Sequence, residues 1–67
     1  RDDRIIVKSS VAMTRRMIYD MQGHLLEEAE CHGNMEFSLS CKEYIPGIYI
    51  LRTVTTEGVG SNKFVIK

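Results

Sequence analysis

The sequence lacks several features that would indicate common functional classes. Its 67 residues contain no tryptophan, one proline and two cysteines. The absence of tryptophan makes carbohydrate binding by aromatic stacking less favoured. Two cysteines are too few for a disulfide framework. The longest wholly apolar stretches, such as residues 48–51, span only a few positions, whereas a transmembrane helix needs roughly 20.

An excess of charge of one sign is also missing. Nine Lys and Arg residues balance nine Asp and Glu residues, so the formal net charge is zero. A neutral chain does not provide the basic face that binds nucleic acid, nor a polybasic patch for anionic membranes. We therefore expect no nucleic-acid partner.

The composition is that of a small folded domain. It is 43% hydrophobic and 27% charged, a balance typical of globular rather than disordered chains. A chain of this length buries only about 60% of its unfolded surface, which leaves a thin core and little room for an active-site cleft. Residues 1–3 resemble a linker remnant, so we expect residues 1–67 to be a single domain of a longer protein.

Turn signals separate short segments at fairly regular intervals, a pattern that predicts an all-β fold. The clearest predicted strand is residues 48–55, which are rich in β-branched and aromatic residues and apolar on both faces at the start. This strand is expected in the centre of a sandwich. The alternation of residues 63–67 predicts a last strand, joined to it by a turn at residues 58–62.

Two further strands are predicted at residues 5–8 and 35–39. The second alternates apolar and polar side chains, which places Met35, Phe37 and Leu39 on one face. Residues 24–30 are ambiguous, because Leu-Leu-Glu-Glu-Ala-Glu has high helix propensity. Gly23 interrupts that helical pattern, and residues 19–24 also suit a hairpin turn, so this segment alone does not decide between helix and strand.

The order of these pieces carries a family resemblance. Residues 18–26 are Ile-Tyr-Asp-Met-Gln-Gly-His-Leu-Leu, residues 46–52 are Pro-Gly-Ile-Tyr-Ile-Leu-Arg, and residues 63–67 are Lys-Phe-Val-Ile-Lys. This ordered set, which covers roughly residues 4–67, resembles the C-terminal sorting domain of the type IX (Por) secretion system. His24 stands where that family usually has Arg or Lys, and Arg16 stands where an apolar residue is usual.

The resemblance implies a small Ig-like antiparallel β-sandwich of about six strands, in which residues 24–31 form a strand. It implies a non-enzymatic address on a cargo protein that passes through the periplasm to the cell surface or the medium. The implied partners are outer-membrane translocon and shuttle proteins, and a sortase-like peptidase that acts on the upstream linker. No cofactor is implied.

The candidate recognition motif consists of two segments of the sequence. The first contains Pro46, Gly47 and Tyr49, and the second is the terminal run Lys63, Phe64, Val65, Ile66 and Lys67. An end strand can present alternating side chains or a free edge to a partner. For Tyr49, core burial is favoured over a docking role, and Gly47 is consistent with close packing of a neighbouring group. The lysines are equally consistent with recognition and with protection of a sheet edge.

Other polar residues have weaker claims to function. Asp20 and Gly23 have the chemistry of a structural turn. His24, Cys31, His32 and Cys41 contain metal-binding atoms but lack paired ligand spacing, so we expect no metal site and no catalytic residues.

Two other functional classes remain open at this point. One is an Ig- or fibronectin-like interaction or spacer module of an extracellular protein, and the other is a fragment of an enzyme whose chemistry lies elsewhere. Exposed edge strands would also permit a strand-exchanged homodimer.

Overall fold

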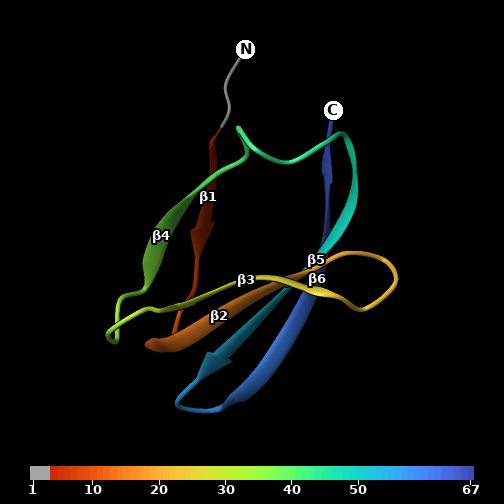
Figure 1. Cartoon of the computed structure of the whole chain (residues 1–67). Helices are drawn as coiled ribbons and strands as arrows, with labels where there is room; N and C mark the ends of the chain where they lie inside the picture. Colours follow the sequence, from red (N-terminus) through yellow and green to blue (C-terminus); the bar gives the residue numbers. More distant parts are fainter. Residues whose placement is uncertain (1–3) are drawn as a thin grey trace.

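The computed structural model describes residues 4–67, and the described part of the chain contains β-strands and no helix (Figure 1). The strands are β1 (Arg4–Lys8), β2 (Met13–Tyr19), β3 (Leu25–Glu30), β4 (Glu36–Ser40), β5 (Gly47–Thr55) and β6 (Gly58–Ile66). The prediction of an all-β fold with about six antiparallel strands is confirmed. The expected linker, residues 1–3, lies outside the described residues. A helix long and apolar enough to cross a membrane is not present among residues 4–67.

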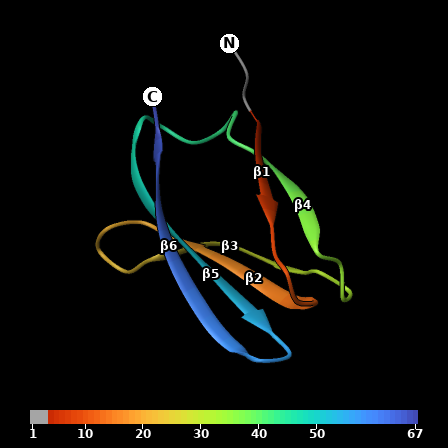
Figure 2. The ribbon, with the colours of Figure 1, turned by 180° about the vertical axis from the view of Figure 1, so that it is seen from behind.

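The strands form two antiparallel sheets. One sheet pairs β1 with β4, and the other has the order β3-β2-β5-β6. Figures 1 and 2 show β1 and β4 side by side, and the end of β6 at the same end of the molecule as the start of β1. The core between the sheets contains Ile18, Leu39, Cys41, Tyr49, Leu51 and Ile66, so both sheets and the β4–β5 connection contribute.

Of the ambiguous residues 24–30, Leu25–Glu30 form an edge strand rather than a helix. β3 pairs with β2, and Arg15 of β2 forms ion pairs with Glu28 and Glu30 on the same face of β3. Residues two apart share a face in a strand, but not in a helix. Pairing with β2 therefore overrides the helix propensity of this segment.

The hairpin between β5 and β6 is tighter than the sequence predicted. Residues 58–62 were expected as its turn, but they belong to β6, and Thr55 pairs with Gly58. The loop is Thr56 and Glu57, where the Glu57 amide donates to Thr55 Oγ1 over 3.1 Å. Gly58 has φ +138°, which an L side chain rarely adopts, so this glycine allows the chain to reverse early.

β4 is shifted by one residue from the prediction and spans residues 36–40 rather than 35–39. Phe37 packs against the core and Leu39 is buried, as predicted, but Met35 precedes the strand and is 55% exposed. The Met35 carbonyl accepts a hydrogen bond from the Ser9 amide, so the backbone pairing of β1 with β4 continues to Met35 although its side chain is not part of the core. Cys31 and Cys41 are both buried, and no disulfide joins them within residues 4–67.

Candidate functional site

The β5–β6 ladder divides the terminal run into two faces. Gly47 pairs with Ile66, Tyr49 with Phe64, and Ile50 with Lys63. Phe64 and Ile66 face the core, where Ile66 is 6% exposed. Lys63 and Val65 lie on the opposite face and are exposed. Of residues 63–66, therefore, a partner can contact the side chains of Lys63 and Val65 without unfolding the strand.

Tyr49 is a core residue with a satisfied hydroxyl. It is 6% exposed, and its hydroxyl donates to the Ile45 carbonyl over 2.6 Å. Its ring centroid lies 5.2 Å from that of Tyr44 and 5.8 Å from that of Phe64, within the range of favourable aromatic pairs. Tyr49 therefore holds the β4–β5 connection against β6 rather than presenting itself to solvent.

Pro46 and Gly47 lead the chain into β5. Pro46 is exposed, and Gly47 is the first residue of the strand. A Cβ built on Gly47 would lie 3.9 Å from Cε2 of Tyr49, which is ordinary van der Waals contact. The fold itself therefore leaves room for a small side chain at Gly47.

The β2–β3 turn is organised by the carboxylate of Asp20. Its Oδ1 accepts the amides of Gln22 and His24, each over 2.9 Å, and its Oδ2 lies 3.1 Å from His24 Nδ1. The backbone hydrogen bond from His24 is the main cause that holds the pKa of Asp20 below its ordinary value. Gly23 has φ +89°, the left-handed conformation that favours glycine. Asp20 and Gly23 thus act together as a turn.

A groove of about 450 Å³ lies between this turn and the β4–β5 connection. It is lined by Asp20, Gln22, Leu26, Glu43, Tyr44, Ile45 and Tyr49. Beside it, the Tyr44 hydroxyl donates to Glu27 over 2.8 Å, and partial burial together with this bond raises the pKa of Tyr44. The groove brings Asp20 and Tyr49 of the candidate set together, whereas the exposed side chains of β6 lie outside its lining.

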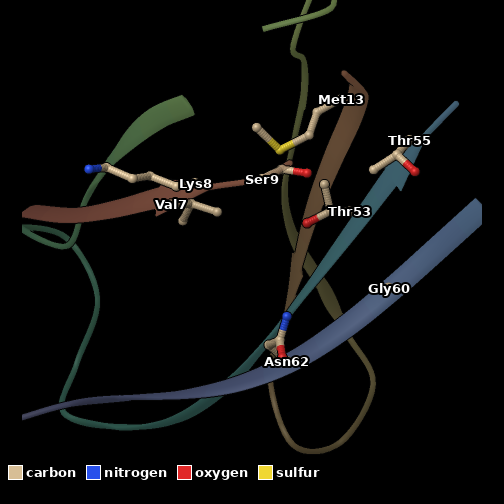
Figure 3. A pocket seen from close by; sticks show the side chains of 8 residues that line it. All are labelled: Val7, Lys8, Ser9, Met13, Thr53, Thr55, Gly60 and Asn62. Carbon is tan, nitrogen blue, oxygen red and sulfur yellow. The ribbon is translucent and has the colours of Figure 1, made fainter. Parts of the chain in front are cut away.

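A second cavity, of about 180 Å³, lies between the end of β1 and strands β2, β5 and β6 of the larger sheet (Figure 3). The side chains around it include Met13, Thr53, Thr55 and Asn62, and Figure 3 shows the Lys8 amino group pointing away from the two threonines. Apart from Lys8, the polar groups of its lining are hydroxyls and an amide, and the Lys8 amino group points away from the two threonines, so these side chains do not converge on one point in the cavity.

The four His and Cys residues considered as metal ligands are not gathered at one site. His24 is bound to the Asp20 turn, His32 is an exposed residue with φ 54°, and Cys31 and Cys41 are buried. Within residues 4–67, no group of three or more His, Cys, Asp or Glu side chains is arranged to hold a metal ion.

Sequence reasoning missed one group of exposed side chains. Ile48 and Ile50 alternate with the buried Tyr49 and Leu51 along β5, so they lie on the solvent face of the sheet. The apolar start of this strand was interpreted as a sign of its central position, and β5 does lie between β2 and β6. The same signal also indicated an apolar outer face.

A family model matches nearly the whole chain. The family is described as the secretion system C-terminal sorting domain, and the match covers residues 2–67. No curated protein and no solved structure matches the chain.

Proposed function

The chain belongs to the family of secretion system C-terminal sorting domains, and from this membership we propose which of its side chains the secretion machinery contacts. The domain is a sorting signal of type IX secretion, which directs the attached protein to the outer membrane and on to the cell surface or the medium. The family is not an enzyme family, and its role implies contact with the secretion machinery. The alternative of an extracellular spacer module gains no support from the comparisons or from residues 4–67.

The domain acts as a folded address in the periplasm, where shuttle proteins and the outer-membrane translocon bind it. A sortase-like peptidase then acts on the linker that precedes the domain. The contacts come from the exposed members of the candidate motif, which are Lys63, Val65 and Lys67 on the terminal run and Pro46 just before β5. The buried members Tyr49, Phe64 and Ile66 pack in the core and fix the conformation of the strands that carry these exposed side chains.

The observation that carries this proposal is the alternation along β6. Because Phe64 and Ile66 pack against the core, the strand is held in one register, and Lys63 and Val65 project from it at fixed positions. An edge strand whose inner face is anchored in this way can offer both side chains and backbone groups to a partner.

The test is an export assay. A signal peptide, a fluorescent protein and residues 1–67 are fused and produced in paired strains with and without the type IX translocon. We expect fluorescence at the surface or in the medium only in the strain with the translocon. Periplasmic retention in both strains would contradict the proposal that this domain suffices as an address.

Point variants then separate the signal from the fold. We expect Lys63→Ala and Lys67→Ala to reduce export while the thermal unfolding of the purified domain stays close to that of the parent. Lys8→Ala, on β1 of the other sheet, is the matched control and keeps normal export. Normal export of both terminal variants would show that these lysines carry no signal.

A further inference from the structure

The outer face of the four-stranded sheet carries a group of apolar side chains exposed to solvent. Leu25, Ile48 and Val65 are 50%, 47% and 57% exposed, and Tyr19 and Ile50 beside them are half-buried. We call Tyr19, Leu25, Ile48, Ile50 and Val65 the outer apolar patch. The solvent face of an antiparallel sheet is normally polar, so this patch departs from the usual alternation.

The register makes the patch continuous. Leu25 of β3 pairs with Tyr19 of β2, which pairs with Ile50 of β5. Ile48 of β5, two residues from Ile50 on the same face, pairs with Val65 of β6. Side chains paired across antiparallel strands lie about 5 Å apart. The patch therefore extends across the whole width of the sheet, from one edge strand to the other.

The charges next to the patch are cationic. Lys63 pairs with Ile50 at the margin on β6, and the Arg52 guanidinium carbon lies 5.8 Å from the centre of the Tyr19 ring. The acidic side chains of this face, Glu28 and Glu30, are both engaged by Arg15. These two carboxylates share one arginine and so leave one negative charge, and with Lys63 and Arg52 the five side chains have a net charge of +1. Lys63 and Arg52 are the cations that border the patch.

We propose that the outer apolar patch is a docking surface for a folded protein of the secretion machinery that presents an apolar area bordered by carboxylates. The class of partner rests on the proposed function, and its chemistry rests on the patch and on Lys63 and Arg52. A second copy of the domain presents the same two cations, Lys63 and Arg52, beside its patch, so it does not supply an apolar area bordered by carboxylates.

Photo-crosslinking in intact cells tests the docking surface. p-Benzoylphenylalanine is placed at position 25 or 48 of the export reporter, and at position 6 as the control. Ile6 is 55% exposed, on β1 of the other sheet. We expect adducts with a protein of the secretion machinery, identified by mass spectrometry, from positions 25 and 48 only, and no such adduct in the strain without the translocon. Equal adducts from position 6 would overturn the proposal.

Substitutions test the chemistry of the contact. We expect Ile48→Thr to lower the cross-linked fraction from position 25 about tenfold, a loss typical of an apolar residue at the centre of an interface. Ile6→Thr, an identical change on the other sheet, leaves it unchanged. Lys63→Glu lowers it more than Lys63→Ala, because a carboxylate would face the carboxylates of the partner. If Lys63→Glu and Lys63→Ala lower the cross-linked fraction equally, the proposal that carboxylates border the apolar area of the partner would be contradicted.

Other occupants would give distinct results. Flotation of the purified domain with phosphatidylglycerol–phosphatidylcholine vesicles, lost in Ile48→Thr, would assign the patch to a membrane surface and overturn the proposal. Adducts between two copies of the domain, with none to the machinery, would assign it to a dimer and also overturn it. If the parent reporter is exported normally and Leu25→Thr and Ile48→Thr change neither export nor adducts, the patch has no docking role while the sorting function stands. Failure of the parent reporter would instead contradict the sorting proposal itself.

Discussion

The guanidinium of Arg16 lies over the ring of Phe37, with 4.3 Å between Cζ and the ring centroid. This contact joins β2 of the larger sheet to β4 of the smaller one. Arg16 is therefore directed into the space between the sheets, and its side chain is 19% exposed. Its Nε is buried and has no hydrogen-bond partner among the described residues, and its Nη2 lies 3.9 Å from Glu27.

Replacement of Arg16 by leucine is expected to stabilise the domain by about 1 kcal/mol. The substitution removes a buried donor that has no partner, and the free energy so recovered exceeds the contributions of the cation–π contact with Phe37 and of the long, partly exposed ion pair with Glu27. Arg16→Ala is expected to destabilise the domain, since it also removes the packing of the aliphatic part of the side chain. Urea denaturation measures both changes. Arg15→Leu is the control on the outer face, where the ion pairs contribute about 0–1 kcal/mol. A loss of stability in Arg16→Leu would contradict this account.

Tyr49→Phe is expected to lower the free energy of unfolding by about 1 kcal/mol, because the Ile45 carbonyl loses the donor 2.6 Å away. Export of the reporter is expected to stay unchanged at a temperature where the variant remains folded, since Tyr49 is 6% exposed. Denaturant unfolding and the fractionation assay measure the two effects separately. A loss of export without a loss of stability would give Tyr49 a direct part in recognition.

The Asp20 turn should make stability depend on acid pH. The pKa of Asp20 is lowered in the folded state, so the folded state holds the charged form better than the unfolded state does. The stabilisation is therefore complete above the unfolded pKa of about 4 and is lost as the pH falls through the folded pKa. When the pH is lowered from 7 to 2, the thermal unfolding temperature should fall less in Asp20→Asn than in the parent. Parallel curves would show that Asp20 contributes nothing to acid sensitivity.

The two glycines near the start of β6 should respond differently to alanine. Gly58 has φ +138°, so Gly58→Ala is expected to cost about 1–3 kcal/mol in backbone strain. Gly60 adopts an ordinary strand conformation, and a Cβ there would meet nothing within 4 Å. Gly60→Ala should be neutral or stabilise by up to about 1 kcal/mol, because it reduces the freedom of the unfolded chain. Chemical denaturation measures the free energy of unfolding of both variants. Equal losses of stability in Gly58→Ala and Gly60→Ala would contradict the assigned turn geometry.

Local pattern predicted the strands where side chains alternate or are strongly β-branched. Residues 48–55 and 63–66 lie in strands for this reason. Residues 24–30 could not be assigned from their own propensity, because the pairing with β2 that decides their conformation is not local. The turn predicted at residues 58–62 was wrong because glycine, serine and asparagine are turn residues that an edge strand also accepts, and only Gly58 has a positive φ.

The candidate site was predictable as a set of positions but not as a surface. The ordered motifs identified residues 46–49 and 63–67, and the β5–β6 ladder places them side by side. Which of these residues face outward depends on which face of the sheet packs against β1 and β4. The outer apolar patch depends in addition on β3, whose Leu25 the sequence did not connect with Ile48.

The sequence by itself determined the all-β class, the small core and the membership of the sorting-domain family, because alternation, turn residues and motif order are properties of neighbouring positions. The tertiary structure decided the rest. It placed Arg16 between the sheets, made Tyr49 a core residue and left Ile48 and Val65 in solvent. The physical reason is that a strand has two equivalent faces, and only the packing of one sheet on another determines which face becomes the core.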